Sequence, residues 1–237
     1  MSLAQLKANG QLWHFSTQNQ DPNLIPTGYA ELDELLGGGW PSHEVVELFA
    51  TTGSGELRLL QPWLQSSAKL LAHEEFPEQN QLPPQTNRLL VFINPPAMLS
   101  AQALSLAGFD LPSIWQINCK TAVEALWTAE QCLKSGCCQH VLLWQGELSI
   151  AKLKRLQLSA QQGQCNLVLM HQPKTRFCSL PVALSLQLSP TENGLKVKVL
   201  KRRGGFIGGQ TDIKFSPWYV VKTTLLAKQP TVLSVAG

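Results

Sequence analysis

A short stretch from Ala50 to Leu57 (ATTGSGEL) has the layout of a turn that could hold a phosphate group. It follows the apolar run VVELF and leads into a segment whose leucines have helical spacing, so it joins a predicted strand to a predicted helix. At such a junction, free backbone N–H groups and the positive end of the helix dipole converge. The stretch therefore predicts an anion-binding turn of an α/β protein.

The side chains of this turn do not suit nucleotide chemistry. When the phosphate-loop pattern G-x-x-x-x-G-K-[ST] is laid on the stretch, Ala50 and Gly55 fall at the two glycine positions, with Gly53 between them. Glu56 then stands where the phosphate-binding lysine belongs, and Leu57 where a hydroxyl group binds Mg²⁺. A carboxylate repels a triphosphate, and leucine offers no oxygen to a hard cation. We expect the shape of the loop without nucleotide binding.

Buried-strand patterns alternate with helical patterns along the middle of the chain. Continuous apolar runs predict strands covered on both faces, and helical spacing predicts the helices between them. The strands are expected at 45–49, 88–94, 114–118, 140–145 and 165–171, and the helices at 56–72, 97–107, 121–135 and 148–162. From Pro181 the pattern changes to period two, with Asn193-Gly194 as a hairpin signal. The sequence predicts an α/β fold with a mainly parallel sheet and a C-terminal antiparallel hairpin at its edge.

Composition narrows the class of protein. An apolar fraction of 44% supports a real core, and a net charge of +3 permits nucleic-acid contact without arguing for it. No apolar run is long enough to span a membrane and no secretory signal is present, so a cytoplasmic protein is expected. The six cysteines form no CxxC pair, and the cluster Cys132, Cys137, Cys138 and His140 leads straight into a strand. We therefore expect no metal and no other cofactor.

The segment IPTGYAELDELLGGGWPSHEVVEL resembles the opening of the RecA/RadA recombinase core. The GGGWP wording and the GELRLL helix start resemble more closely a degenerate branch of the RecA-like superfamily, the branch of the ImuA and SulA proteins, with ImuA nearer. The resemblance covers roughly residues 25–215 and implies a RecA-like three-layer sandwich for them. Residues 1–24 are then an N-terminal arm or helix, and residues 216–237 a C-terminal strand or tail.

The same resemblance implies that the ATPase has been lost. In the family an acidic residue after the second strand activates water, and the matching position here is near Pro96. The strand that should end in a metal-binding aspartate ends in Gln145. Together with Glu56, these positions predict a degenerate P-loop fold that is not an enzyme. A true ATPase with an unorthodox site is the less favoured alternative.

Some family features persist. Gln172 matches a phosphate-sensing glutamine, and Lys201 and Arg203 match basic residues that reach a neighbouring subunit. Strand alternation predicts that Lys201 and Arg203 point one way and Arg202 the other. These basic residues have two interpretations. One is a solvated basic hairpin without a role in binding, and the other is contact with an acidic partner or a phosphate backbone. Reversing the charge of Lys201 and Arg203 is then expected to abolish association without loss of stability.

Apolar residues also lie outside the recognisable core. Leu6 and Trp13 belong to the N-terminal segment, which either folds back on its own core or docks on a neighbour. Residues 218–235 form a second candidate interaction segment. Homo-oligomer formation is left open.

The resemblance implies a non-catalytic accessory protein of the SOS response to DNA damage, acting in error-prone translesion DNA synthesis and repair through protein–protein interaction. Its implied partners are a Y-family-like polymerase homologue and the error-prone replicative-type polymerase of the mutasome, with RecA as a further candidate. Short loops at 146–149 and 173–180 argue against recombinase-type gripping of DNA, and direct DNA contact stays open. The alternative is a SulA-like inhibitor that binds the tubulin-like cell-division protein.

Overall fold

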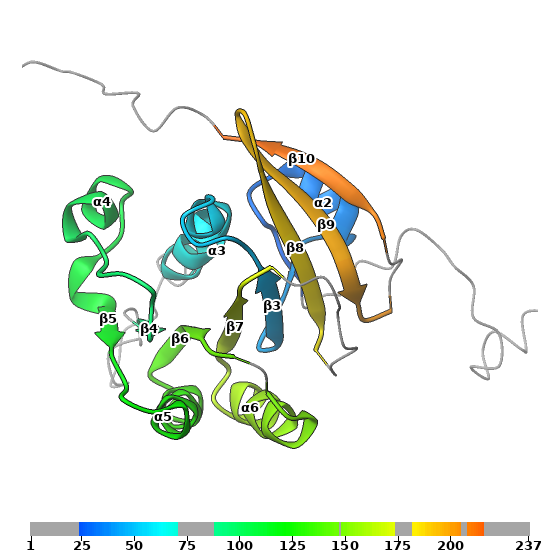
Figure 1. Ribbon diagram of the computed structural model, residues 1–237. Coiled ribbons are helices and arrows are strands. Elements are labelled where there is room, and N and C mark those ends of the chain that lie inside the picture. The colour runs from blue at the N-terminus through cyan, green and yellow to red at the C-terminus, as the bar shows by residue number, and fades with distance from the viewer. Residues whose placement is uncertain (1–23, 71–87, 147, 174–181, 205–207, 216–237) are drawn as a thin grey trace, which may run out of the picture.

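The computed structural model describes residues 24–70, 88–146, 148–173, 182–204 and 208–215, without the side chains of residues 66–70. An eight-stranded sheet runs through this part of the protein (Figure 1). From one edge to the other its strands are β10 (Gln210–Lys214), β9 (Gly194–Arg202), β8 (Leu184–Thr191), β3 (Val45–Phe49), β7 (Asn166–His171), β6 (Cys138–Trp144), β4 (Leu89–Ile93) and β5 (Ile114–Ile117). Strands β8 to β5 are mutually parallel, and β9 is antiparallel to β8 and β10. The predicted mainly parallel sheet with a C-terminal antiparallel hairpin is confirmed.

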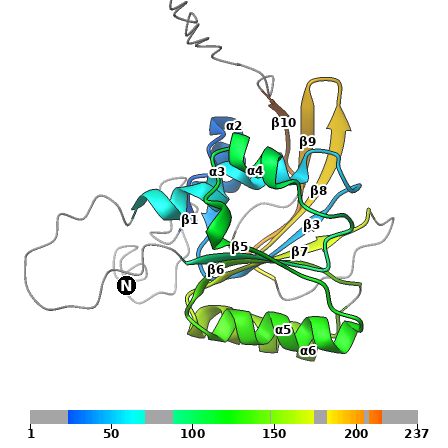
Figure 2. The ribbon, with the colours of Figure 1, turned by 90° about the vertical axis from the view of Figure 1, so that its left-hand side faces the viewer.

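Helices lie on both faces of the sheet (Figure 2). One face carries α2 (Ala30–Leu36), α3 (Glu56–Leu70) and α4 (Ala101–Leu106), and the other carries α5 (Ala122–Lys134) and α6 (Ile150–Gln162). The central strands are apolar on both faces because each face is buried: Val46 and Leu48 pack toward α3, and Val45 packs toward α5 and α6. A small two-stranded sheet of β1 (Leu24–Ile25) and β2 (Trp40–Pro41) and a 3₁₀ turn, η1 (Leu111–Ser113), complete the described elements.

Local signals position several helix ends. Thr121 and Glu124 form a capping box at the start of α5, in which each side chain accepts a backbone N–H of the other residue. The helix predicted over 97–107 is shorter, because Ser100 caps it through the N–H of Ala103 and α4 begins only at Ala101.

The C-terminal hairpin turns one residue earlier than its sequence signal indicated. Thr191 pairs with Gly194, so Glu192 and Asn193 make the turn and Gly194 already lies in β9. A Cβ atom on Gly194 would lie 1.8 Å from the carbonyl oxygen of Ile213 in β10. The glycine is therefore required by the close approach of a further strand. Because β10 forms the edge of the sheet, the hairpin strands β9 and β8 are second and third from that edge.

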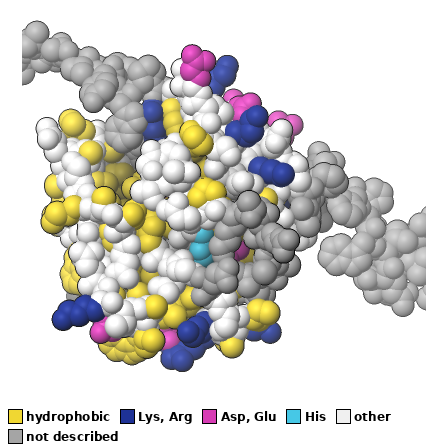
Figure 3. All heavy atoms as spheres, viewed as in Figure 1, with side chains coloured by type: hydrophobic (Ala, Val, Ile, Leu, Met, Phe, Trp, Pro, Cys, Tyr) yellow, Lys and Arg dark blue, Asp and Glu magenta, His cyan; other side chains and the backbone are white. Residues whose placement is uncertain are grey.

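The surface seen in Figure 3 shows hydrophobic side chains gathered beside basic ones at the lower edge, over α5 and α6. Within the part of the chain that the structure describes, no helix is long and apolar enough to cross a membrane. The candidate arm residues Leu6 and Trp13 and the segment 218–235 lie outside the described residues. The division into arm, core and tail stays a prediction.

Candidate functional site

The turn between β3 and α3 lies at the carboxyl edge of the parallel strands. The N–H of Ala50 donates to the carbonyl of His171 in β7 at 2.9 Å, which ties the start of the turn to the neighbouring strand. Gly53 and Gly55 have φ values of +78° and +110°, a region that glycine enters without steric cost. Helix α3 then begins at Glu56. The loop shape expected of a phosphate-binding turn is thus present.

The carboxylate of Glu56 occupies this turn. The N–H of Gly53 donates to its Oε1 at 2.8 Å, and the N–H of Gly55 donates to its Oε2 at 3.0 Å. Glu56 is only 5% exposed. These N–H groups are the donors that a bound phosphate would need, because they face the first turn of the helix. The sequence predicted repulsion of a phosphate; in the structure the carboxylate also takes its place.

Neighbouring side chains close the turn from outside. A Cβ on Gly55 would lie 2.9 Å from the ring of Phe215, so this ring sits directly over the loop. The guanidinium carbon of Arg58 lies 4.6 Å from the centroid of the same ring, and the ring of Tyr29 lies 6.2 Å away. Leu57 packs against the core beneath α3. The residue at the Mg²⁺-ligand position therefore serves packing.

The other sequence-predicted positions lie at the same edge of the sheet, since each follows a parallel strand. Gln172, after β7, donates from Nε2 to Oγ1 of Thr52 at 2.9 Å and so reaches the turn. Pro96, exposed, follows β4, and Gln145, half-buried, follows β6. The structure thus brings Gln172 to the turn. At the positions of Gln145 and Pro96 it has neither a metal-binding carboxylate nor a general base.

Sequence reasoning missed a buried carboxylate–imidazole pair next to the turn. Nε2 of His171 lies 3.4 Å from Oε1 of Glu47, with both side chains almost fully buried. The ring of Phe49 stacks on His171 with 5.0 Å between ring centroids. The contact between Oε1 of Glu47 and Nε2 of His171 does not have hydrogen-bond geometry, and neither atom has a hydrogen-bond partner among the described residues. The available signal was Glu47 itself, a lone acid in the buried run VVELF.

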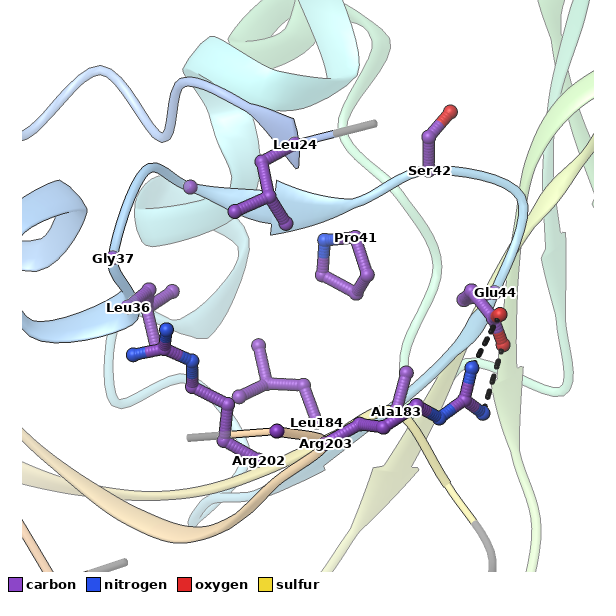
Figure 4. A pocket seen from close by; sticks show the side chains of 12 residues that line it. Leu24, Leu36, Gly37, Pro41, Ser42, Glu44, Ala183, Leu184, Arg202 and Arg203 are labelled. Carbon is purple, nitrogen blue, oxygen red and sulfur yellow. Dashed lines mark hydrogen bonds and ion pairs between the residues drawn. The ribbon is translucent and has the colours of Figure 1, made fainter. Parts of the chain in front are cut away.

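A hollow of about 450 Å³ lies between the glycine segment 37–39, which follows α2, and the end of β9 (Figure 4). Arg202 points into it and donates from Nη1 to the carbonyl of Leu35 at 3.2 Å, near the C-terminal end of α2. A Cβ on Gly37 would lie 2.3 Å from Nη2 of Arg202. The guanidinium therefore satisfies a carbonyl at the end of the helix, where a positive charge is favoured by the helix dipole.

Arg203 lines the same hollow and forms an ion pair with Glu44. Its Nη1 and Nη2 lie 2.8 and 3.4 Å from the two oxygens of that carboxylate (Figure 4). The Nε2 atoms of Gln157 and Gln161, on α6, donate to the same oxygens at 2.7 and 3.2 Å. Glu44 thus ties the end of β9 to α6.

The grouping of Lys201 with Arg203 on one side and Arg202 on the other stays a prediction. Arg202 and Arg203 both line the hollow, but their side chains run in opposite directions, one to Leu35 and the other to Glu44 (Figure 4). The register of β8 and β9 shifts between Ser185 and Leu186, which adds a residue to β9, and β9 ends at Arg202. The extra residue, Leu200, precedes the three basic residues, so it changes the face of all of them relative to the earlier part of β9.

No group of three or more His, Cys, Asp or Glu side chains that could hold a metal ion occurs within the described ranges. Cys119, Cys132, Cys137, Cys138 and Cys165 form no disulfide there.

Comparison with known proteins finds no matching family model and no matching curated protein. Among solved structures, 385 chains match. One is the crystal structure of SulA from Pseudomonas aeruginosa, with a TM-score of 0.40 and 29% sequence identity. The match covers 54% of this chain and 97% of that one. At that TM-score, the similarity establishes neither fold nor function.

Proposed function

We propose that this chain is a non-catalytic, RecA-like accessory protein of the SOS response, acting in the cytoplasm in error-prone translesion DNA synthesis by binding other proteins. The observation that carries the non-catalytic part is the carboxylate of Glu56 bound to the N–H groups of Gly53 and Gly55. The assignment to translesion synthesis rests on the resemblance of GGGWP (37–41) and GELRLL (55–60) to the ImuA branch.

Glu56 opposes nucleotide binding in two ways. A phosphate can reach these N–H groups only if it displaces a buried carboxylate, which must then leave its donors. The displaced carboxylate would also remain beside the phosphate as a like charge. Pro96 supplies no general base and Gln145 no metal-binding carboxylate, so a nucleotide that did bind would not be hydrolysed.

The fold itself is proposed to be the RecA-like three-layer sandwich. Helices on both faces of a mainly parallel sheet support it, as does a central strand, β3, that leads through a glycine turn into α3. A protein of this class without ATPase chemistry works through its surfaces. The proposed partners are the Y-family-like polymerase homologue and the error-prone replicative-type polymerase of the mutasome, with RecA as a third candidate.

Two measurements test the proposal. Isothermal titration of the full chain with Mg-ATP is expected to show no binding, and micromolar affinity would overturn the non-catalytic assignment. In the second, tagged protein is mixed with the purified polymerase homologue or with the tubulin-like division protein. Binding of the polymerase homologue supports the translesion role. Binding of the division protein alone assigns the SulA-like alternative.

A further inference from the structure

An apolar groove of about 250 Å³ runs between α5 and α6, on the face of the sheet opposite α3. Leu126 and Leu156 line it, and Val123 and Trp127 of α5 stand beside them. Val123 is 72% exposed and Trp127 is 62% exposed, although both are large and apolar. Neighbouring exposed apolar side chains of this kind mark interaction sites more often than isolated ones do.

The charges at this groove are predominantly positive. Lys152 and Arg155 of α6 line it together with one carboxylate, Glu130. Nη2 of Arg155 lies 2.6 Å from Oε2 of Glu130, and Lys134 pairs with the other oxygen of the same carboxylate. The single negative charge is therefore already neutralised within the protein. A ligand approaching the groove meets an excess of cations from Lys134, Lys152 and Arg155.

We propose that the groove between α5 and α6 is a docking site for an acidic amphipathic segment of a partner protein. A large apolar side chain of that segment packs on Trp127 between Val123 and Leu156. Its flanking carboxylates face Lys152 and Arg155. Tryptophan and arginine are the residue types that dominate binding energy at protein interfaces, and both are present here. This inference rests on the proposed function, because a protein that acts by contact needs such a surface.

The charge of the groove disfavours a second copy of this chain as the occupant. A symmetric dimer on this face would place the same patch of both copies in contact, so two grooves of net positive charge would meet. Like charges brought together at an interface are penalised. An acidic segment removes that penalty and adds attraction, so charge complementarity selects it.

A displayed library of random peptides, each long enough for about four helical turns (roughly 15 residues), is the first probe. It is selected on the full chain, and peptides that also bind the Trp127→Ala variant are removed. Enrichment of peptides with an aromatic or leucine anchor flanked by glutamate or aspartate is the expected result. Enrichment of basic peptides, or none that depends on Trp127, would overturn the proposal.

The affinity of the best enriched peptide is then measured by fluorescence polarisation. Trp127→Ala and Lys152→Glu are each expected to weaken binding at least tenfold, equal to about 1.4 kcal/mol. The matched controls are Trp115→Ala, an exposed tryptophan on β5, and Lys154→Glu, a lysine of α6 that does not line the groove. Equal losses in the controls would show the binding to be nonspecific.

Other occupants give different results. A wild-type dimer that Trp127→Ala dissociates in sedimentation experiments would make the occupant a second copy, and binding of a synthetic peptide of residues 1–23 would make it the chain's own arm. Either outcome overturns the proposal. The Mg-ATP titration on the same protein tests the proposed function separately, so failure of the groove and failure of the non-catalytic assignment are distinguishable.

Discussion

The Oε1 atom of Glu56 accepts the N–H of Gly53 at 2.8 Å, so the first side chain of α3 closes the turn that precedes it. The other oxygen accepts the N–H of Gly55. In a phosphate-binding turn the same groups are held open for a ligand. Here the N–H groups of Gly53 and Gly55 are bonded to the protein's own carboxylate, so we expect them to contribute to stability.

Replacing Glu56 with alanine should therefore destabilise the protein. Both N–H groups lose their acceptor, and losses of this kind cost about 1–2 kcal/mol. Denaturant unfolding of Glu56→Ala measures the change, with Glu34→Ala on the exposed surface of α2 as the control. Equal stability of the two variants would show that water replaces the carboxylate without cost.

Gly37→Ala should destabilise the end of α2, and Arg202 should account for part of the effect. Gly37 has a φ of +67°, where alanine costs about 1–2 kcal/mol, and its new Cβ would also meet the guanidinium of Arg202. The loss should be smaller in an Arg202→Ala background, because only the backbone strain remains. Gly136→Ala is the matched control, since φ there is +71° and a Cβ meets nothing within 4 Å. Identical losses in both backgrounds would contradict the contact.

Arg203→Glu should lower stability modestly, which revises the expectation that reversing this charge leaves stability unchanged. The substitution places a second carboxylate beside Glu44 and removes an ion pair whose arginine is 57% exposed, so a loss of about 1 kcal/mol or less is expected. Lys198→Glu, on the exposed side of β9, serves as the control for charge alone.

Association of the Lys201→Glu and Arg203→Glu variants stays a prediction. Their affinity for the polymerase homologue and for single-stranded DNA is measured at low and high salt. Wild-type affinity in a folded double variant would show that these residues form an ordinary solvated edge.

His140 should make the protein less stable in mild acid. Burial, helped by the charge of Arg88, lowers its pKa from 6.5 to about 3, and its ring packs edge-on against Trp63. Below pH 6.5 the imidazole of His140 binds a proton in the unfolded chain but not in the folded chain. The free energy of unfolding therefore falls by about 1.4 kcal/mol per pH unit. Above pH 6.5 this dependence disappears.

Urea denaturation on both sides of pH 6.5 measures this slope. The comparison of wild type with His140→Phe is made in a His43→Asn background, because burial also lowers the pKa of His43. An unchanged slope in the phenylalanine variant would assign the acid sensitivity to other groups.

The sequence alone predicted the parallel strands, the helices that cover them and the glycine turn, because these depend on short-range periodicity and on caps such as Thr121 with Glu124. It also showed that Glu56, Pro96 and Gln145 stand where nucleotide chemistry needs a lysine, an acidic base and an aspartate. It did not predict β1, β2 or β10. That the carboxylate of Glu56 fills the turn, which lies against the ring of Phe215, is seen only in the structure. The pattern of residue types around Glu56 does not determine the direction in which its side chain points.

The tertiary structure alone decided which distant residues meet. Arg202 reaches Leu35 and Arg203 reaches Glu44 across more than half of the chain, because β8 and β9 add to the sheet beside β3. Strand order sets these contacts, and a one-residue bulge in β9 changes which side chains share a face. The pairing of Glu47 with His171 likewise exists because β3 and β7 are neighbours in the sheet, although more than a hundred residues separate the two strands along the chain.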